Sequence, residues 1–420
     1  MTNAFRSLFS INRRAAFVSS PISHFRIFKN FKNFKNSIKT DPTLPLIIVS
    51  LGILLTASSG SWDITNHLLN RPETFFSPPH AGIYSGVVLV LFGSLMTYRY
   101  HRHRSRTSDI NSGGKSLPIY LRLVLIGTGM LISAGPFDFA WHTAFGFDGL
   151  LSPSHAVLTT GMVLCGIGAF LGLVSEDNYC RIMITKIGTR RTNKDSYRSA
   201  GLRSSLYIII SITAVWITVS GIIHMVSLPF SDTDYFKFNP NPVLAGLIAT
   251  LCFPFLVSFI LFTSWKLTNK FGVLSATGMI FIFINLTTAI LPNENLVPTI
   301  PFYMINVIPI IIIDMLLSLP TLGVSLSQTQ KKLVNLIAGT ILGLIFFMLY
   351  FPLITHTYNE VSINPQMVWP SVTASIYFGI IDEIYPLLIF SSVALGIIGI
   401  LLSLKLISHA FWLASDYNRA

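Results

Sequence analysis

Charged side chains are scarce in this sequence: Asp, Glu, Lys and Arg make up 11% of its 420 residues, whereas 51% are hydrophobic. A soluble domain usually has about 25% charged residues, so this composition excludes an ordinary soluble globular protein. Only three cysteines are present, and none forms a CxxC pair, which argues against a disulfide framework or a thiolate metal site. The sequence also lacks ATP-binding, flavin and haem motifs.

Long apolar runs dominate the chain. A membrane-spanning helix needs roughly 20 mostly apolar residues, and its backbone groups must pair within the helix. The runs predict an all-α, polytopic transmembrane bundle of about ten spans, built from outward-facing helical hairpins. We expect the spans near residues 44–69, 78–98, 118–143, 153–174, 204–227, 242–265, 271–291, 300–326, 333–355 and 385–406. Residues 371–381 are too few to cross the bilayer alone and are expected to be interfacial or re-entrant.

The distribution of basic residues predicts the orientation. If the N-terminus is inside, only Arg71 and Lys237 of the 29 Lys and Arg residues fall in outer segments. This follows the positive-inside rule and predicts a plasma-membrane protein with both termini in the cytoplasm. The net charge of +12 is explained by basic residues that gather on the inner side of the lipid bilayer. No nucleic-acid partner is therefore expected.

Four regions follow from this pattern. Residues 1–42 hold many Lys and Arg and are predicted to form a basic cytoplasmic tail on an anionic membrane surface, with a mitochondrial presequence as the alternative. Residues 43–175 form a four-helix tandem-repeat region, and 176–203 a basic cytoplasmic loop. Residues 204–410 form a C-terminal transmembrane region of about six spans.

A tandem Asp/His motif lies at the outer ends of the first four predicted spans. The motif D-x3-H-x12-H occurs twice, 75 residues apart, in Asp63, His67 and His80 and in Asp138, His142 and His155. The Asp and the first His share one helix face because they are four residues apart. The second His follows a Ser and a Pro, which is typical of a helix N-terminus. A tight hairpin would return that His to the other two, so each hairpin predicts one carboxylate and two imidazoles in one place.

This set of side chains suits a metal ion. Two imidazoles and a carboxylate can bind copper, zinc, iron(II) or manganese, and three protein ligands leave an open position, as in catalytic sites. The spacing leaves open whether there are two sites or one dinuclear site. The alternative is that these residues cap helices and pair with one another. The duplication of costly ionisable groups beside lipid favours a metal.

The second copy resembles a known motif. Its D-F-A-W-H at 138–142 and S-P-S-H at 152–155 are similar to a copper-binding motif in one membrane subunit of the particulate methane and ammonia monooxygenases. The resemblance covers about 20 residues, and the helix pairs extend it over 63–175. It implies copper ligation by Asp138, His142 and His155, with the first triad as a second set. In that family the Trp-His triad comes first, whereas here it comes second.

Two further residues are candidates. Asp314 lies in an apolar run, where an ionisable side chain suggests a proton relay or an ion path; a helix–helix hydrogen bond with Asp314 protonated is the alternative. His224 lies near the end of the fifth predicted span and follows Ser220 by four residues, which partly matches the repeated motif. An interfacial polar residue is the alternative for His224.

Three functions remain open, and the sequence identifies no catalytic residue. The first is a copper-dependent membrane monooxygenase, or a subunit of one within an oxidase complex, that oxidises a small apolar substrate with O2 at the outer face. The second is a metal transporter or permease that uses the same triads, with Asp314 deeper on its path. Transport sites usually lie near the midplane, which counts against it. The third is a non-catalytic subunit in which a metal joins the hairpins.

Overall fold

The computed structural model describes residues 43–68, 74–107, 117–145, 151–187, 194–227, 242–292, 294, 297, 300–347 and 381–416. These residues form helices joined by short turns, and they contain no β-strand. The all-α prediction is therefore confirmed. The predicted basic tail lies outside the described residues, which begin at Thr43, and so does the predicted interfacial segment 371–381 except for its last residue, Ile381, which begins the final described helix.

The described helices follow in chain order: α2 (Thr43–Leu68), α3 (Pro78–Thr107), α4 (Ile119–Phe145), α5 (Pro153–Ile187), α6 (Lys194–Ser227), α7 (Pro242–Thr268), α8 (Val273–Ile290), α9 (Ile300–Ile305), α10 (Val307–Ser318), η2 (Leu319–Leu322), α11 (Gln328–Ile341), η3 (Leu342–Phe346) and α14 (Ile381–Asp416). Within the described residues, nine stretches are long and apolar enough to cross a bilayer, and the chain is an integral membrane protein on this basis. The predicted span 333–355 begins in α11 and runs beyond the described residues.

Several helices are longer than their predicted spans, among them α5 and α6. α5 continues to Ile187 and α6 begins at Lys194, so most of the segment 176–203, expected to be a loop, is helical. Lys, Arg and Glu are strong helix formers. Hydropathy therefore marks where the apolar part of each helix ends, and not where the helix itself ends.

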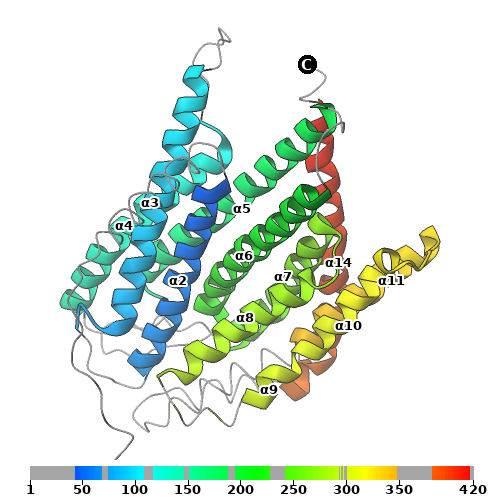
Figure 1. Cartoon of the computed structure of the whole chain (residues 1–420). Coiled ribbons are helices and arrows are strands. Elements are labelled where there is room, and N and C mark those ends of the chain that lie inside the picture. The colour runs from blue at the N-terminus through cyan, green and yellow to red at the C-terminus, as the bar shows by residue number, and fades with distance from the viewer. Residues whose placement is uncertain are drawn as a thin grey trace, which may run out of the picture. The chain divides into compact units, whose positions relative to one another are not determined.

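The first four described helices form two antiparallel hairpins, α2 with α3 (hairpin 1) and α4 with α5 (hairpin 2), shown in Figure 1. Glycine brings the two helices of each hairpin into backbone contact. A Cβ atom on Gly52 would lie 2.8 Å from the carbonyl oxygen of Gly86, and one on Gly127 would lie 2.6 Å from that of Gly161. Such close approach requires a residue without a side chain. Three glycine contacts recur with the 75-residue shift: Gly52 and Gly127, Gly86 and Gly161, Gly93 and Gly168.

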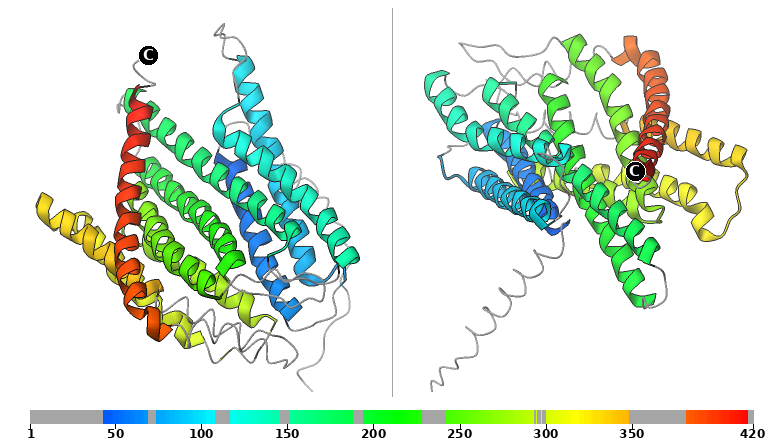
Figure 2. Two further views of the ribbon diagram at one scale, coloured as in Figure 1. Left: turned by 180° about the vertical axis from the view of Figure 1, so that it is seen from behind. Right: turned by 90° about the horizontal axis from the view of Figure 1, so that it is seen from above.

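The C-terminal region has its own core. Buried aromatic and aliphatic side chains of α6, α7, α8, α10, α11 and α14 form one large hydrophobic cluster, and the hairpins contribute to two smaller ones. α14 packs along α7, as Figure 2 shows from behind, and α6 contacts α5 and α7. α6 therefore connects the hairpin region to the C-terminal region.

Candidate metal centre

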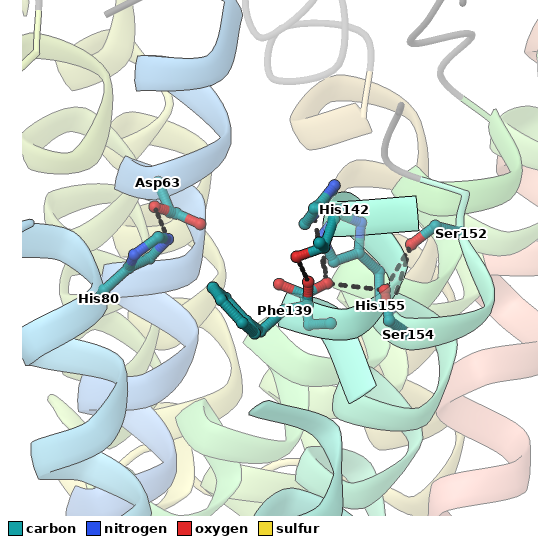
Figure 3. Close-up of polar contacts among 9 residues, drawn as sticks. Asp63, His80, Phe139, His142, Ser152, Ser154 and His155 are labelled. Atoms are coloured by element: carbon teal, nitrogen blue, oxygen red, sulfur yellow. Dashed lines mark hydrogen bonds and ion pairs between the residues drawn. The ribbon is translucent and has the colours of Figure 1, made fainter. Parts of the chain in front are cut away.

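Three of the predicted ligands converge in hairpin 2. Asp138 and His142 lie in the last two turns of α4, and His155 lies in the first turn of α5 (Figure 3). One ligand atom from each residue lies within 4.8 Å of the other two. The Nε2 atoms of His142 and His155 are 3.4 and 3.5 Å from the same oxygen of Asp138, Oδ1. We call this group the hairpin 2 centre.

The start of α5 positions His155. The Ser152 hydroxyl accepts a hydrogen bond from the backbone N–H of His155 at 3.2 Å, and Pro153 occupies the first helical position. This is the N-terminal arrangement that the Ser-Pro pair predicts. The cap fixes the first turn of α5, and so places His155 opposite the end of α4.

Ser154 is a member of the site that sequence reasoning missed. Its hydroxyl donates a hydrogen bond to Asp138 Oδ1 at 2.7 Å and is itself 3.1 Å from the Ser152 hydroxyl. A hydrogen bond of this kind fixes the orientation of a carboxylate ligand and tunes its basicity. The S-P-S-H motif contained the signal, but from the sequence we gave a role only to its first serine, its proline and its histidine.

Hairpin 1 reproduces part of this geometry. The Nε2 atom of His80 lies 3.0 Å from Asp63 Oδ1, and its Nδ1 atom lies 3.0 Å from the carbonyl oxygen of Thr74. His67 lies one helical turn after Asp63 in α2, and its side chain is outside the described part of the structure. The pairing of Asp63 with His80 is thus shown, whereas the complete first triad stays a prediction.

The tautomer of His80 follows from its partners. A carbonyl oxygen only accepts, so Nδ1 carries the hydrogen. A neutral ring then turns the lone pair of Nε2 toward the Asp63 carboxylate, which also only accepts. That contact is favourable when a cation, either a proton or a metal ion, lies between the two atoms. Histidine metal ligands commonly donate their other N–H to a backbone carbonyl in the same way.

An aromatic cluster lies between the two hairpins. The Phe75 ring is 5.0 Å from that of Tyr84 and 5.9 Å, edge to face, from that of Phe139 on α4. Phe139 lies between the two polar groups in Figure 3. Phe75 and Phe139 are exposed within the chain. The two sites are therefore separated by apolar surface.

Asp314 has a structural partner. One oxygen of its fully buried carboxylate accepts hydrogen bonds from the backbone N–H groups of Gly272 at 3.0 Å and Ser275 at 2.9 Å, at the start of α8. Ser318, which receives a hydrogen bond from Trp265, lies 3.4 Å from the other oxygen. Asp314 therefore caps the N-terminus of another helix, where a negative charge is favourable. Of the two interpretations offered for Asp314, the structure shows the helix–helix hydrogen bond.

His224 lies apart from this centre. It lies in the last turn of α6, and its ring is 5.0 Å from that of Phe253 on α7. Among the described residues, the three-residue group able to hold a metal consists of Asp138, His142 and His155 alone. His224 is thus not brought to the predicted metal ligands.

A scan against protein-family models, a search of curated proteins and a search of solved structures find no match to this chain. The resemblance to the copper-binding monooxygenase subunit therefore rests on the motif alone.

Proposed function

We propose that the chain binds a transition-metal ion at Asp138, His142 and His155, with copper as the first candidate and zinc or iron as alternatives. The observation that carries this proposal is the approach of one carboxylate oxygen and two imidazole nitrogens to within 4.8 Å of one another at the end of a membrane helix pair. An O,N,N ligand set suits these metals. The hydrogen bond from Ser154 supports the same conclusion, because it holds the carboxylate in place.

We further propose that the bound metal supports oxidation of a small, apolar substrate by O2, with or without partner membrane subunits. A copper ion would supply the redox chemistry, and three protein ligands leave room for an exogenous one. The chain itself would bind and orient the ion through the ligands of the hairpin 2 centre. The exposed rings of Phe75 and Phe139 offer apolar surface beside it. From the basic-residue distribution we propose an outer-face position in the plasma membrane.

Metal content tests the first proposal. The protein in lipid nanodiscs would be incubated separately with Cu(II), Zn(II) and Fe(II), passed through a desalting column and analysed by inductively coupled plasma mass spectrometry. About one equivalent of metal is expected at the hairpin 2 centre. His142→Ala and His155→Ala should abolish it, whereas His103→Ala, an exposed histidine at the opposite end of α3, should leave it unchanged. Equal metal in all four proteins would refute the site.

The identity of the metal tests the second proposal. Stoichiometric copper whose electron paramagnetic resonance spectrum shows two nitrogen ligands would support it and would justify a screen for substrate-dependent O2 consumption. Stoichiometric zinc without copper would contradict the proposed oxidation by O2. The metal would then have a structural role, holding α4 and α5 together. In that case, removing the metal should lower the unfolding temperature, because a structural metal binds the folded state alone.

A further inference from the structure

One buried face of α6 carries four polar atoms that have no hydrogen-bond partner among the described residues. They are Trp216 Nε1, Ser220 Oγ, His224 Nε2 and Ser227 Oγ. Their spacing of four, four and three residues places them in a single stripe along the helix. The stripe begins at the middle of the span Ser204–Ser227 and ends at its last residue. We call it the α6 polar stripe. On the same helix, a Cβ atom on Gly221 would lie 3.5 Å from the side chain of Thr159, one turn after His155 on α5.

The hydroxyl groups of the stripe differ from their neighbours on the same helix. Thr213 and Thr218 donate hydrogen bonds to carbonyl oxygens one turn earlier, at 2.7 and 2.9 Å. Ser220 and Ser227, which are equally buried, do not use this option. Buried polar groups nearly always have a partner because losing their hydration is unfavourable. Four unpaired groups in one line therefore indicate a partner that reaches the stripe in another conformation.

Aromatic rings cover the stripe. The ring of Phe253 lies 5.0 Å from that of His224, and the ring of Phe346 lies 5.8 Å from that of Trp216. Phe347 stacks on Phe253 with the centroids 6.4 Å apart. Each unpaired atom is buried, so water does not reach it while these rings are in place.

The covering rings stand on irregular parts of their helices. Phe253 precedes Pro254, which lies inside α7 and removes a backbone hydrogen bond there. Phe346 ends the π-helical turn Leu342–Phe346. Such turns are rare in proteins, and those that occur are often found at functional sites. Both segments can therefore rearrange with less loss of backbone hydrogen bonding than a regular helix.

We propose that the α6 polar stripe lines a path that admits small, uncharged, oxygen-bearing molecules, water first, from the Ser227 end of α6 to the middle of the bilayer. The Trp216 N–H only donates, so the entering molecule must accept a hydrogen bond, while the serines and His224 can pair with either kind of group. Phe253, Phe346 and Phe347 close the path in the conformation described here. Trp216 stacks on Phe281 at 3.7 Å, so the path ends there and does not cross the membrane. This proposal does not depend on metal binding.

Thiol labelling tests the path. Ser220→Cys and Thr218→Cys would each be placed in a chain whose three native cysteines are replaced by alanine. Thr218 is buried at the same depth, but it lies on the opposite face of α6 and its hydroxyl is bonded to the backbone. In proteoliposomes, a small uncharged thiosulfonate should modify the cysteine at 220 at least about tenfold faster than the one at 218. Adding Phe253→Ala should raise the rate at 220 further, and equal rates at the two positions would overturn the proposal.

A measurement on the unaltered chain guards against variants that fail to fold. Hydroxyl-radical footprinting in nanodiscs oxidises side chains that contact water. Oxidation of Trp216 should exceed that of Trp265, which is also buried but donates its N–H to Ser318 at 3.1 Å. Oxidation of Trp216 at or below the level of Trp265 would show that water does not reach the middle of the stripe.

Discussion

The two hairpins have the same frame but different sites. Their glycine contacts superimpose under one 75-residue shift, and in each the Asp of the last turns of the first helix meets a His at the start of the second. They differ two residues after the capping serine, where hairpin 1 has Pro79 and hairpin 2 has Ser154. Pro79 has no hydroxyl and cannot donate to Asp63 as Ser154 donates to Asp138 at 2.7 Å.

The caps differ as well. The Ser152 hydroxyl receives the His155 N–H, whereas the Ser77 hydroxyl is buried without a hydrogen-bond partner among the described residues. Glycine contacts between backbones thus keep the packing of the two helices the same in both hairpins. Single polar residues at the helix ends change which side chains pair there.

Loss of a ligand should have the largest effect and should tell the two hairpins apart. His155→Ala is expected to weaken metal binding roughly 100-fold or more, because changes outside the ligand set already cost about 10–100-fold. His80→Ala should leave binding at the hairpin 2 centre within about twofold of wild type. Chelator competition in nanodiscs measures both affinities. An equal loss in the two variants would instead indicate one dinuclear site shared by the hairpins.

The shared frame can be tested at its closest contacts. Gly127→Ala and Gly52→Ala should each destabilise the protein by about 1–3 kcal/mol, because the new Cβ atom would overlap the facing helix. Gly129→Ala is the matched control: it lies in the same helix, with no atom within 4 Å of its Cβ position. Denaturation in mixed micelles measures the change, and an equal effect at 127 and 129 would refute the backbone contact.

A carboxylate outside the hairpins separates stability from metal binding. Asp314→Ala should cost about 2 kcal/mol of stability, since it removes the acceptor for two backbone N–H groups of α8, and it should leave metal content unchanged. Asp138→Ala should do the opposite, removing the metal with little change in apo stability. If Asp314→Ala lowered metal content in a folded protein, Asp314 would belong to an ion path after all.

The smallest expected effect concerns the residue that distinguishes the hairpins. Ser154→Ala should weaken metal binding about tenfold without removing it, because the ligands remain while the carboxylate loses its orienting hydrogen bond. Ser133→Ala on α4, whose hydroxyl bonds only to its own helix, should have no effect. The reciprocal change Pro79→Ser should strengthen metal binding in hairpin 1. Isothermal titration distinguishes the three, and an unchanged affinity in Ser154→Ala would remove that serine from the site.

Much of the hairpin 2 centre was predictable because its rules are local. A four-residue spacing places Asp138 and His142 on one helix face, and the Ser-Pro pair starts the next helix. The glycine contacts were equally repetitive in the sequence, yet sequence reasoning did not identify them. A glycine in an apolar run shows no sign of whether it faces lipid, like Gly129, or another backbone, like Gly127.

Other parts of the molecule depend on contacts between distant segments. From the sequence, Asp314 was a candidate for ion or proton transfer, because the residues whose N–H groups donate to its carboxylate are 39 and 42 positions away in the chain. The α6 polar stripe was invisible for a related reason. Serine and tryptophan are ordinary in membrane helices, and only the packing shows which of them lack partners.

The sequence by itself determined that the chain is a bundle of membrane helices and that two of its hairpins are copies, because hydropathy and motif spacing act over one or two turns of helix. Only the tertiary structure decided that Ser154 holds Asp138, that Asp314 caps α8 and that one face of α6 is polar and covered. Each of these depends on which helix faces which, and in lipid that choice is made by close packing and hydrogen bonding between segments rather than by the hydrophobicity of any one of them.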